Sequence, residues 1–200
     1  MDWWTLDHKY IWHPFTQHAL DTEIIAIKKG KGALLYDVDG NEYIDAIASW
    51  WTNAFGHANP TIANAIKQQV DELEHVIFAG FTHQPAVVLA ENLVNILPNH
   101  QAKVFFSDNG STAVEVALKM AIQYWYNRGK KKNKILCFEN AYHGDTFGAM
   151  SVGKSTFFTP FYDNLFEVIQ LPLPNENNLS DILSKVNQCT ENETIAAFIF

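Results

Sequence analysis

Short apolar runs separated by a helical pattern characterise the second half of the chain. Residues 103–106, 135–138, 166–171 and 194–200 are rich in the aliphatic and aromatic residues that favour buried strands. Between the first two runs, apolar residues recur at the spacing of one helix face, at Val114, Ala117, Leu118, Ala121 and Trp125. A short helix capped by Ser180 is expected before the last run. This alternation predicts an α/β fold with a mostly parallel sheet flanked by helices, and a right-handed βαβ crossover from the first run to the second.

The first half of the chain carries the pattern of a small antiparallel sheet followed by two helices. Residues 23–47 contain strand-like runs, and the Asp-Gly pair at 39–40 predicts a hairpin turn between two of them. Asn59 and Pro60 predict the start of a helix that runs to about residue 73, because asparagine caps helices and proline fits their first turn. A second helix is expected between residues 82 and 98.

Composition narrows the classes of partner and compartment. The chain has 200 residues, 48% of them apolar, and 14 basic against 22 acidic residues give a net charge of −8. This balance argues against nucleic acid and acidic membrane surfaces as partners. The N-terminal residues lack the pattern of a signal peptide, and no apolar run reaches membrane-spanning length, so a cytoplasmic protein is expected. Cys137 and Cys189 lack C-x-x-C spacing and read as buried thiols of a reducing compartment, and the histidines are not spaced for a metal site.

The run from Ser107 to Glu115 joins an expected strand to an expected helix. Gly110 supplies a flexible turn, and Thr112 with Glu115 matches a T-x-x-E capping box. A helix start directs free backbone N–H groups and a partial positive charge at its surroundings, and the hydroxyls of Ser111 and Thr112 stand at the same place. The combination suits a phosphate group. The alternative is a plain helix cap without a ligand.

A second polar cluster follows the run 135–138. In a doubly wound sheet, loops that leave the carboxyl ends of neighbouring strands converge on one crevice, which would bring Tyr142, His143 and Asp145 beside Ser111. An aromatic ring, an imidazole and a carboxylate next to a phosphate cradle suit a flat heterocyclic phosphate ester. The alternative is that Tyr142 is a core residue, His143 a polar neighbour and Asp145 a helix cap.

These motifs resemble those of the class III aminotransferases, fold-type I enzymes that use pyridoxal 5'-phosphate (PLP). The resemblance lies in residues 110–125 and in Tyr-His-Gly at 142–144. Three further stretches, Ile11–Thr16, Ser49–Trp51 and His75–His83, resemble in particular the branch of the class that acts in biotin biosynthesis, as do residues 142–151. The similarity extends from about Lys9 to the last residue.

The resemblance implies a set of site residues. Gly110 and Ser111 are expected to hold the PLP phosphate, and Tyr142 and His143 to contact the cofactor, with Tyr142 stacked on its ring. Substrate contacts are expected from Tyr142 again and from three further side chains, Phe15, Trp50 and Asp145. Some relatives carry tyrosine where this chain has Phe15, and a phenyl ring cannot donate the corresponding hydrogen bond. Without the resemblance, Trp50 would be interpreted as core packing.

The resemblance also implies that part of the machinery lies outside this chain. The lysine that forms the Schiff base with PLP is expected beyond Phe200, so no catalytic residue is assigned here, and the 200 residues alone are expected to be inactive. Residues 1–55 would belong to the small domain and residues 56–200 to the first part of the large cofactor-binding domain. The final apolar run reads as a strand cut short, and a homodimer is expected by analogy with the fold type.

The function implied by the resemblance is transamination of 8-amino-7-oxononanoate to 7,8-diaminononanoate, with S-adenosylmethionine as the amino donor. Two alternatives stay open. One is another class III aminotransferase that acts on an ω-amino acid or an ornithine derivative. The other is a non-catalytic protein that binds a phosphate ligand and is complete at Phe200.

Overall fold

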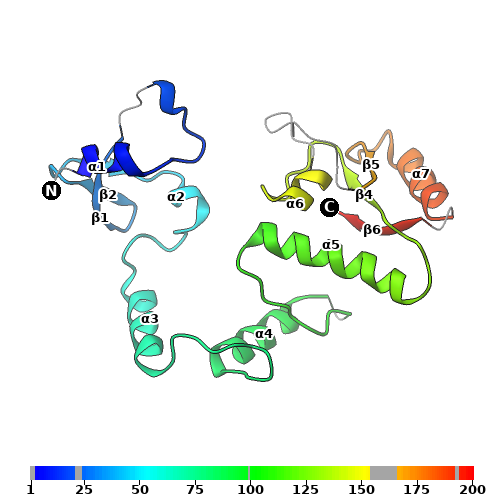
Figure 1. The fold of residues 1–200 in the computed structure, drawn as a ribbon, viewed down its shortest axis with the longest axis horizontal. Helices are drawn as coiled ribbons and strands as arrows, with labels where there is room; N and C mark the ends of the chain where they lie inside the picture. Colours follow the sequence, from blue (N-terminus) through cyan, green and yellow to red (C-terminus); the bar gives the residue numbers. More distant parts are fainter. Residues whose placement is uncertain (1–2, 21–23, 99, 154–165, 192–193) are drawn as a thin grey trace. The chain divides into compact units, whose positions relative to one another are not determined.

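The computed structural model describes residues 3–20, 24–98, 100–153, 166–191 and 194–200. The chain divides into two compact units, residues 1–88 and 89–200, and helix α4 (Gln84–Ile96) crosses the boundary between them (Figure 1). Among the described residues, no helix has both the length and the apolar character needed to cross a lipid bilayer.

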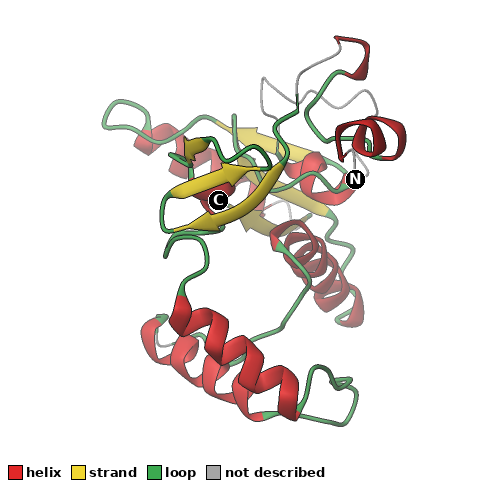
Figure 2. Cartoon of the chain, turned by 90° about the vertical axis from the view of Figure 1, so that its left-hand side faces the viewer, coloured by secondary structure: helices red, strands yellow, loops and turns green. Residues whose placement is uncertain are grey.

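The first unit contains the expected antiparallel sheet, whose strands are among the yellow arrows of Figure 2. Its order is β1-β2-β3, and it follows helix α1 and a 3-10 turn, η1. The bounds are α1 Trp3–Tyr10, η1 His18–Leu20, β1 Ile27–Lys31, β2 Leu34–Asp37 and β3 Glu42–Ile44. The hairpin prediction is confirmed: Gly40 has φ +91°, and Asp37 Oδ1 accepts hydrogen bonds from the backbone N–H groups of Asp39 (3.0 Å) and Asn41 (2.8 Å).

A short element with unusual backbone angles follows this sheet. Element α2 (Ala48–Trp51) has φ angles of 48°, 47°, 63° and 67° at its four residues, so the turn is left-handed although none of them is glycine. A Cβ atom makes this conformation unfavourable by roughly 1–2 kcal/mol per residue. Surrounding contacts must therefore hold the turn.

Both predicted helices of this part of the chain are confirmed. Helix α3 (Pro60–Glu72) begins where Asn59 Oδ1 accepts hydrogen bonds from Thr61 N (3.0 Å) and Ile62 N (3.3 Å), with Pro60 in its first turn. Helix α4 ends two residues before Pro98. The signals for these ends lie within a few residues of each helix, which explains why the sequence alone could place them.

The second unit is built on a parallel sheet of order β5-β4-β6. Its elements are α5 Gly110–Asn127, β4 Lys134–Phe138, α6 Phe147–Val152, β5 Val168–Leu171, α7 Leu179–Glu191 and β6 Ile195–Ile199. Helix α5 runs along β6 (Figure 1), and its Trp125 indole N–H donates to Ala196 O at 3.0 Å. Leu118, Ile135 and Val152 form the buried core between α5, β4 and α6.

In this unit, the predictions for residues 103–106 and for Ser180 are wrong. Residues 103–106 form no strand and are a loop between α4 and α5, with Phe105 64% exposed (Figure 1). Within the described residues, no strand pairs with this run, and a strand needs a neighbour for its N–H and C=O groups. The expected crossover from this run to β4 is therefore not formed. In addition, α7 begins at Leu179, so Ser180 lies inside the helix and does not cap it.

Candidate functional site

The start of α5 is capped one turn earlier than the sequence predicts. Asn109 Oδ1 accepts a hydrogen bond from Thr112 N (3.0 Å), and Thr112 Oγ1 accepts one from Asn109 N (3.1 Å). Thr112 is thus the third helical residue, and the predicted Thr112–Glu115 box is wrong. Asparagine before glycine is itself a strong capping signal, and it places the first turn at Gly110.

This cap determines which groups at the helix start can meet a ligand. The Thr112 hydroxyl is engaged with Ser107 Oγ (2.6 Å) and Asn109 O (3.0 Å). The first intrahelical hydrogen bond runs from Ala113 N to Asn109 O, so the N–H groups of Gly110 and Ser111 precede the helical ladder. The groups at the α5 start that suit an anion are therefore these two N–H groups and the Ser111 hydroxyl.

Residues 142–146 lie directly against this helix start. The backbone N–H of Asp145 donates to Ser111 Oγ at 3.2 Å, and the Tyr142 hydroxyl donates to Asp145 Oδ2 at 2.8 Å. The hydrogen bond to Asp145, followed by burial, raises the pKa of Tyr142. The expectation that Tyr142, His143 and Asp145 lie beside Ser111 is confirmed.

Gly144 allows the two segments to come this close. Its φ is +124°, and a Cβ built on it would lie 2.1 Å from Ser111 Oγ and 2.8 Å from Ser111 Cα. A side chain at residue 144 would therefore collide with the backbone of α5 as well as with a hydroxyl. The close contact between the two motifs requires glycine at this position.

Glu115 is a residue that the sequence interpretation misassigned. Its Oε1 accepts hydrogen bonds from the backbone N–H groups of Gly148 (2.7 Å) and Ala149 (3.3 Å), at the start of α6. A carboxylate at a helix start is favoured by the helix dipole. Glu115 thus ties α5 to α6, the helix that directly follows residues 142–146. Its partners lie 33 and 34 positions away, and no local pattern indicates them.

Together the two segments line a depression of about 640 Å³. Five of the predicted site residues line it, and Asn109, Val114, Gly144 and Thr146 complete its wall. The predicted residues are Gly110, Ser111, Tyr142, His143 and Asp145. Tyr142 is 60% exposed and Thr146 precedes the first residue of α6, so the alternatives of a core tyrosine and an Asp145 helix cap are wrong.

The polar groups in this pocket fit a phosphate ester with a polar ring such as PLP. His143 Nε2 and Thr146 Oγ1 are buried and have no hydrogen-bond partner among the described residues. Unpaired buried polar atoms are costly, so a ligand that bonds to them would be stabilised. Burial also lowers the pKa of His143, which favours the neutral form of its imidazole.

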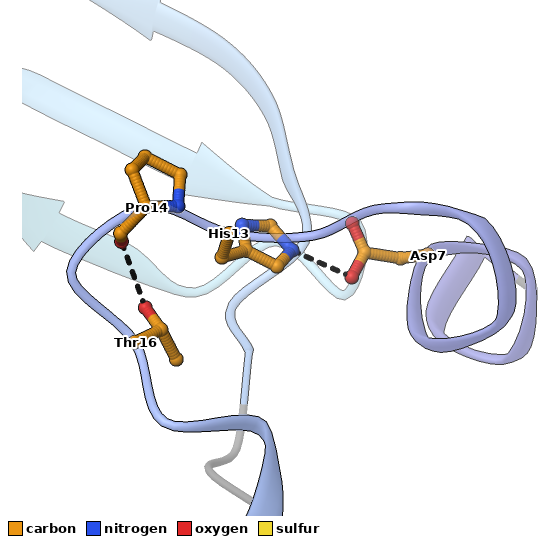
Figure 3. A network of polar contacts seen from close by, with 4 residues as sticks. All are labelled: Asp7, His13, Pro14 and Thr16. Atoms are coloured by element: carbon orange, nitrogen blue, oxygen red, sulfur yellow. Dashed lines mark hydrogen bonds and ion pairs between the residues drawn. The ribbon is translucent and has the colours of Figure 1, made fainter.

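Two predicted substrate residues, Phe15 and Trp50, lie in the first unit and form a pair of their own. Their ring centroids are 5.0 Å apart. Figure 3 shows the contacts that flank Phe15: His13 Nε2 lies 2.8 Å from Asp7 Oδ1, and Thr16 Oγ1 donates to Pro14 O at 3.1 Å. These contacts bracket a turn in which Phe15 has φ +54°. Both rings are more than half exposed.

Comparison with known proteins identifies the family of the chain. The family model for aminotransferase class-III matches residues 15–200. The chain is 56% identical over 168 residues to the adenosylmethionine-8-amino-7-oxononanoate aminotransferase of Synechococcus elongatus, which covers 84% of this chain and 40% of the relative. It is 44% identical over 200 residues to the enzyme of that name from Staphylococcus aureus, and this match covers 96% of this chain and 43% of the relative. The chain spans less than half the length of these curated relatives.

Solved structures agree with the sequence relatives. The crystal structure of the Methanocaldococcus jannaschii adenosylmethionine-8-amino-7-oxononanoate aminotransferase matches with a TM-score of 0.89 and 38% identity, over 98% of this chain and 45% of that one. A transaminase from the marine bacterium Virgibacillus matches with a TM-score of 0.83 and 32% identity, over 97% of this chain and 46% of that one. The predicted α/β fold of fold-type I is thereby confirmed. The chain belongs to the class III aminotransferases, a family of PLP-dependent enzymes.

Proposed function

We propose that this chain forms the N-terminal part of an enzyme that transfers an amino group from S-adenosylmethionine to 8-amino-7-oxononanoate. The product would be 7,8-diaminononanoate, for biotin biosynthesis. The observation that carries the proposal is the meeting of the α5 start and residues 142–146 in one pocket. The choice of substrates is supported by the names of the relatives from Synechococcus and Staphylococcus.

In this proposal the second unit holds the cofactor. The N–H groups of Gly110 and Ser111 and the Ser111 hydroxyl bind the PLP phosphate. The exposed ring of Tyr142 lies against the pyridine ring, held in orientation by its hydrogen bond to Asp145. His143 offers its Nε2 atom, which is buried and has no hydrogen-bond partner among the described residues. When bound, PLP supplies an electron-withdrawing ring that weakens the C–H bond next to the substrate amine.

Side chains of each unit, taken separately, suit parts of the acceptor. Asp145 is a carboxylate and suits the amino group of 8-amino-7-oxononanoate, while Tyr142 bounds the same space. Phe15 and Trp50 contribute apolar surface to the acceptor's carbon chain. Because Phe15 has no hydroxyl, it shapes the pocket without a hydrogen bond to the substrate.

The proposal extends to the organisation of the whole enzyme. Residues 1–55 belong to the small domain, residues 56–200 to the large domain, and the lysine that binds PLP covalently lies beyond Phe200. The enzyme acts as a cytoplasmic homodimer. The intact mass of the native protein before and after borohydride reduction tests this arrangement. A chain much heavier than these 200 residues, with PLP retained after reduction, is expected; a mass matching the 200 residues without PLP would contradict it.

Ser111→Ala in the complete enzyme tests the cofactor site. Loss of one hydroxyl contact to a charged phosphate should weaken PLP binding by about 10- to 100-fold, measured by titrating the apoenzyme with PLP. Ser180→Ala, at an exposed serine of α7, is the matched control and should leave PLP binding unchanged. Equal PLP affinity in both variants would remove Ser111 from the phosphate site.

A panel of acceptors tests the substrate assignment. The wild-type enzyme should aminate 8-amino-7-oxononanoate and prefer it to pyruvate and 2-oxoglutarate. A preference for pyruvate or 2-oxoglutarate would instead indicate another class III aminotransferase.

A further inference from the structure

The left-handed turn at Ala48–Trp51 needs an explanation in terms of its neighbours. Its four residues all carry side chains, and their φ angles are 48°, 47°, 63° and 67°. Such a backbone persists only where surrounding contacts over-determine it. Two of the four residues, Trp50 and Trp51, present large rings, with centroids 6.5 Å apart. The direction of both rings depends on the turn.

Asp45 adds contacts to this turn beyond the backbone hydrogen bonds from Trp51 N to Ile47 O (2.8 Å) and from Asn53 N to Ala48 O (2.9 Å). Its Oδ2 accepts hydrogen bonds from Ser49 Oγ (2.8 Å) and from His57 Nε2 (2.7 Å). Its backbone oxygen accepts from Ala48 N at 3.3 Å. The Asp45 side chain is 6% exposed, so the carboxylate is shielded from water and these bonds are stronger than they would be at the surface. One carboxylate thus connects the turn to His57.

His57 is itself fixed to the sheet. It exchanges two backbone hydrogen bonds with Gly32, from Gly32 N to His57 O (3.0 Å) and from His57 N to Gly32 O (2.8 Å). A Cβ on Gly30 would lie 2.7 Å from His57 Cβ, so only glycine at that position of β1 admits the imidazole so closely. The sheet therefore holds His57, and His57 holds the Asp45 carboxylate in place.

We propose that Asp45, supported by His57, is a positioning residue that keeps residues 48–51 in the left-handed turn and so fixes the directions of the Trp50 and Trp51 rings. The consequence for catalysis rests on the proposed function, in which Trp50 contacts the acceptor. In the folded protein, Trp50 also packs on Phe15. Loss of the Asp45 contacts should release the turn and displace this pair of rings.

Asp45→Asn in the complete enzyme is the first test. The variant keeps the size of the side chain but loses the negative charge of the carboxylate, whose Oδ2 accepts two hydrogen bonds. It should raise the KM for 8-amino-7-oxononanoate by about 10- to 100-fold, with a smaller change in kcat and unchanged PLP affinity. It should also weaken the exciton signal of the Trp50–Trp51 pair in circular dichroism. Asp39→Asn, at an exposed aspartate of the β2–β3 turn, is the matched control and should change neither the KM nor the exciton signal.

Ala48→Gly combined with Asp45→Asn separates positioning from chemistry. Glycine adopts the left-handed backbone without the Cβ penalty, so the double variant should recover most of the exciton signal and of the KM. Recovery would not follow if Asp45 itself contacted the substrate. Ser49→Ala, which removes a single hydrogen bond, should raise the KM in the same direction by about fivefold and keeps the test valid if Asp45→Asn does not fold.

The outcomes distinguish this inference from the proposed function. An Asp45→Asn enzyme with an unchanged exciton signal, or a KM defect that Ala48→Gly does not relieve, would overturn the positioning role. If the wild-type enzyme does not accept 8-amino-7-oxononanoate, the proposed function fails, while the exciton signal still decides whether Asp45 holds the turn.

Discussion

Gly144→Ala tests whether the close contact between α5 and residues 142–146 shapes the proposed cofactor site. The added Cβ would lie 2.1 Å from Ser111 Oγ, 2.6 Å from Ser111 Cβ and 2.8 Å from Ser111 Cα. Rotation of the serine side chain cannot relieve the last two contacts, because they involve atoms fixed by the helix. The loop must therefore move away from α5, and the pocket must widen.

The size of the effect follows from the overlap. Forcing an extra methyl group into a close-packed contact costs typically about 1–3 kcal/mol, which corresponds to about 5- to 150-fold in a binding constant. The left-handed φ of +124° at Gly144 adds backbone strain for alanine. Gly129→Ala is the matched control: Gly129 also has a positive φ, +69°, but a Cβ there meets no atom within 4 Å. It carries the backbone strain without the collision.

The assay is titration of the apoenzyme of each variant with PLP, followed by absorbance. Gly144→Ala should bind PLP about 5- to 150-fold more weakly than Gly129→Ala. Thermal unfolding of both apoenzymes separates a local effect on the site from general destabilisation. If the two variants bind PLP equally well, the contact between Gly144 and Ser111 does not shape a PLP site, which would refute the proposed placement of the phosphate.

Two further predictions concern carboxylates that join separate segments. Glu115→Ala should leave the N–H groups of Gly148 and Ala149 unpaired, at a cost of about 1–3 kcal/mol, and should speed the hydrogen exchange of both groups. Glu115→Gln should speed this exchange less. Unchanged exchange in the alanine variant would contradict the tie between α5 and α6. Hydrogen bonds from Ser49, followed by that from His57, lower the pKa of Asp45 to about 2 from 3.8, so its stabilisation is complete above pH 3.8 and is lost as the pH falls toward 2. Acid unfolding should therefore be less steep in Asp45→Asn than in the wild type over that interval, and identical curves would exclude this linkage.

Some features of the molecule could be read from single short stretches of sequence. Asn59 and Pro60 located the start of α3, and Gly40 located the turn between β2 and β3. The apolar run at residues 135–138 predicted β4, the central strand of the parallel sheet. In each case the interacting groups lie within a few positions of one another, so the local pattern contains the physical cause.

Short sequence patterns gave a wrong prediction where two residues competed to cap the same helix or where a strand needed a neighbouring strand. Thr112 and Glu115 match a capping box, but Asn109 caps α5 one turn earlier and leaves Glu115 available for α6. Residues 103–106 have the composition of a strand, yet a strand forms only beside another strand. Composition cannot supply that neighbour.

The sequence alone determined the residue types of the site and the elements that carry them, because helix starts and turns are set by nearby residues. The fold class also led us to expect residues 142–145 beside Ser111, but only the tertiary structure decided which atoms meet. The contact between Asp145 N and Ser111 Oγ joins positions 34 apart, and that between His57 and Asp45 joins positions 12 apart. Such contacts depend on how α5 packs on α6 and how the turn at Ala48–Trp51 is held beside the first sheet. They arise from packing between elements, whose geometry no local pattern of hydrophobic and polar residues contains.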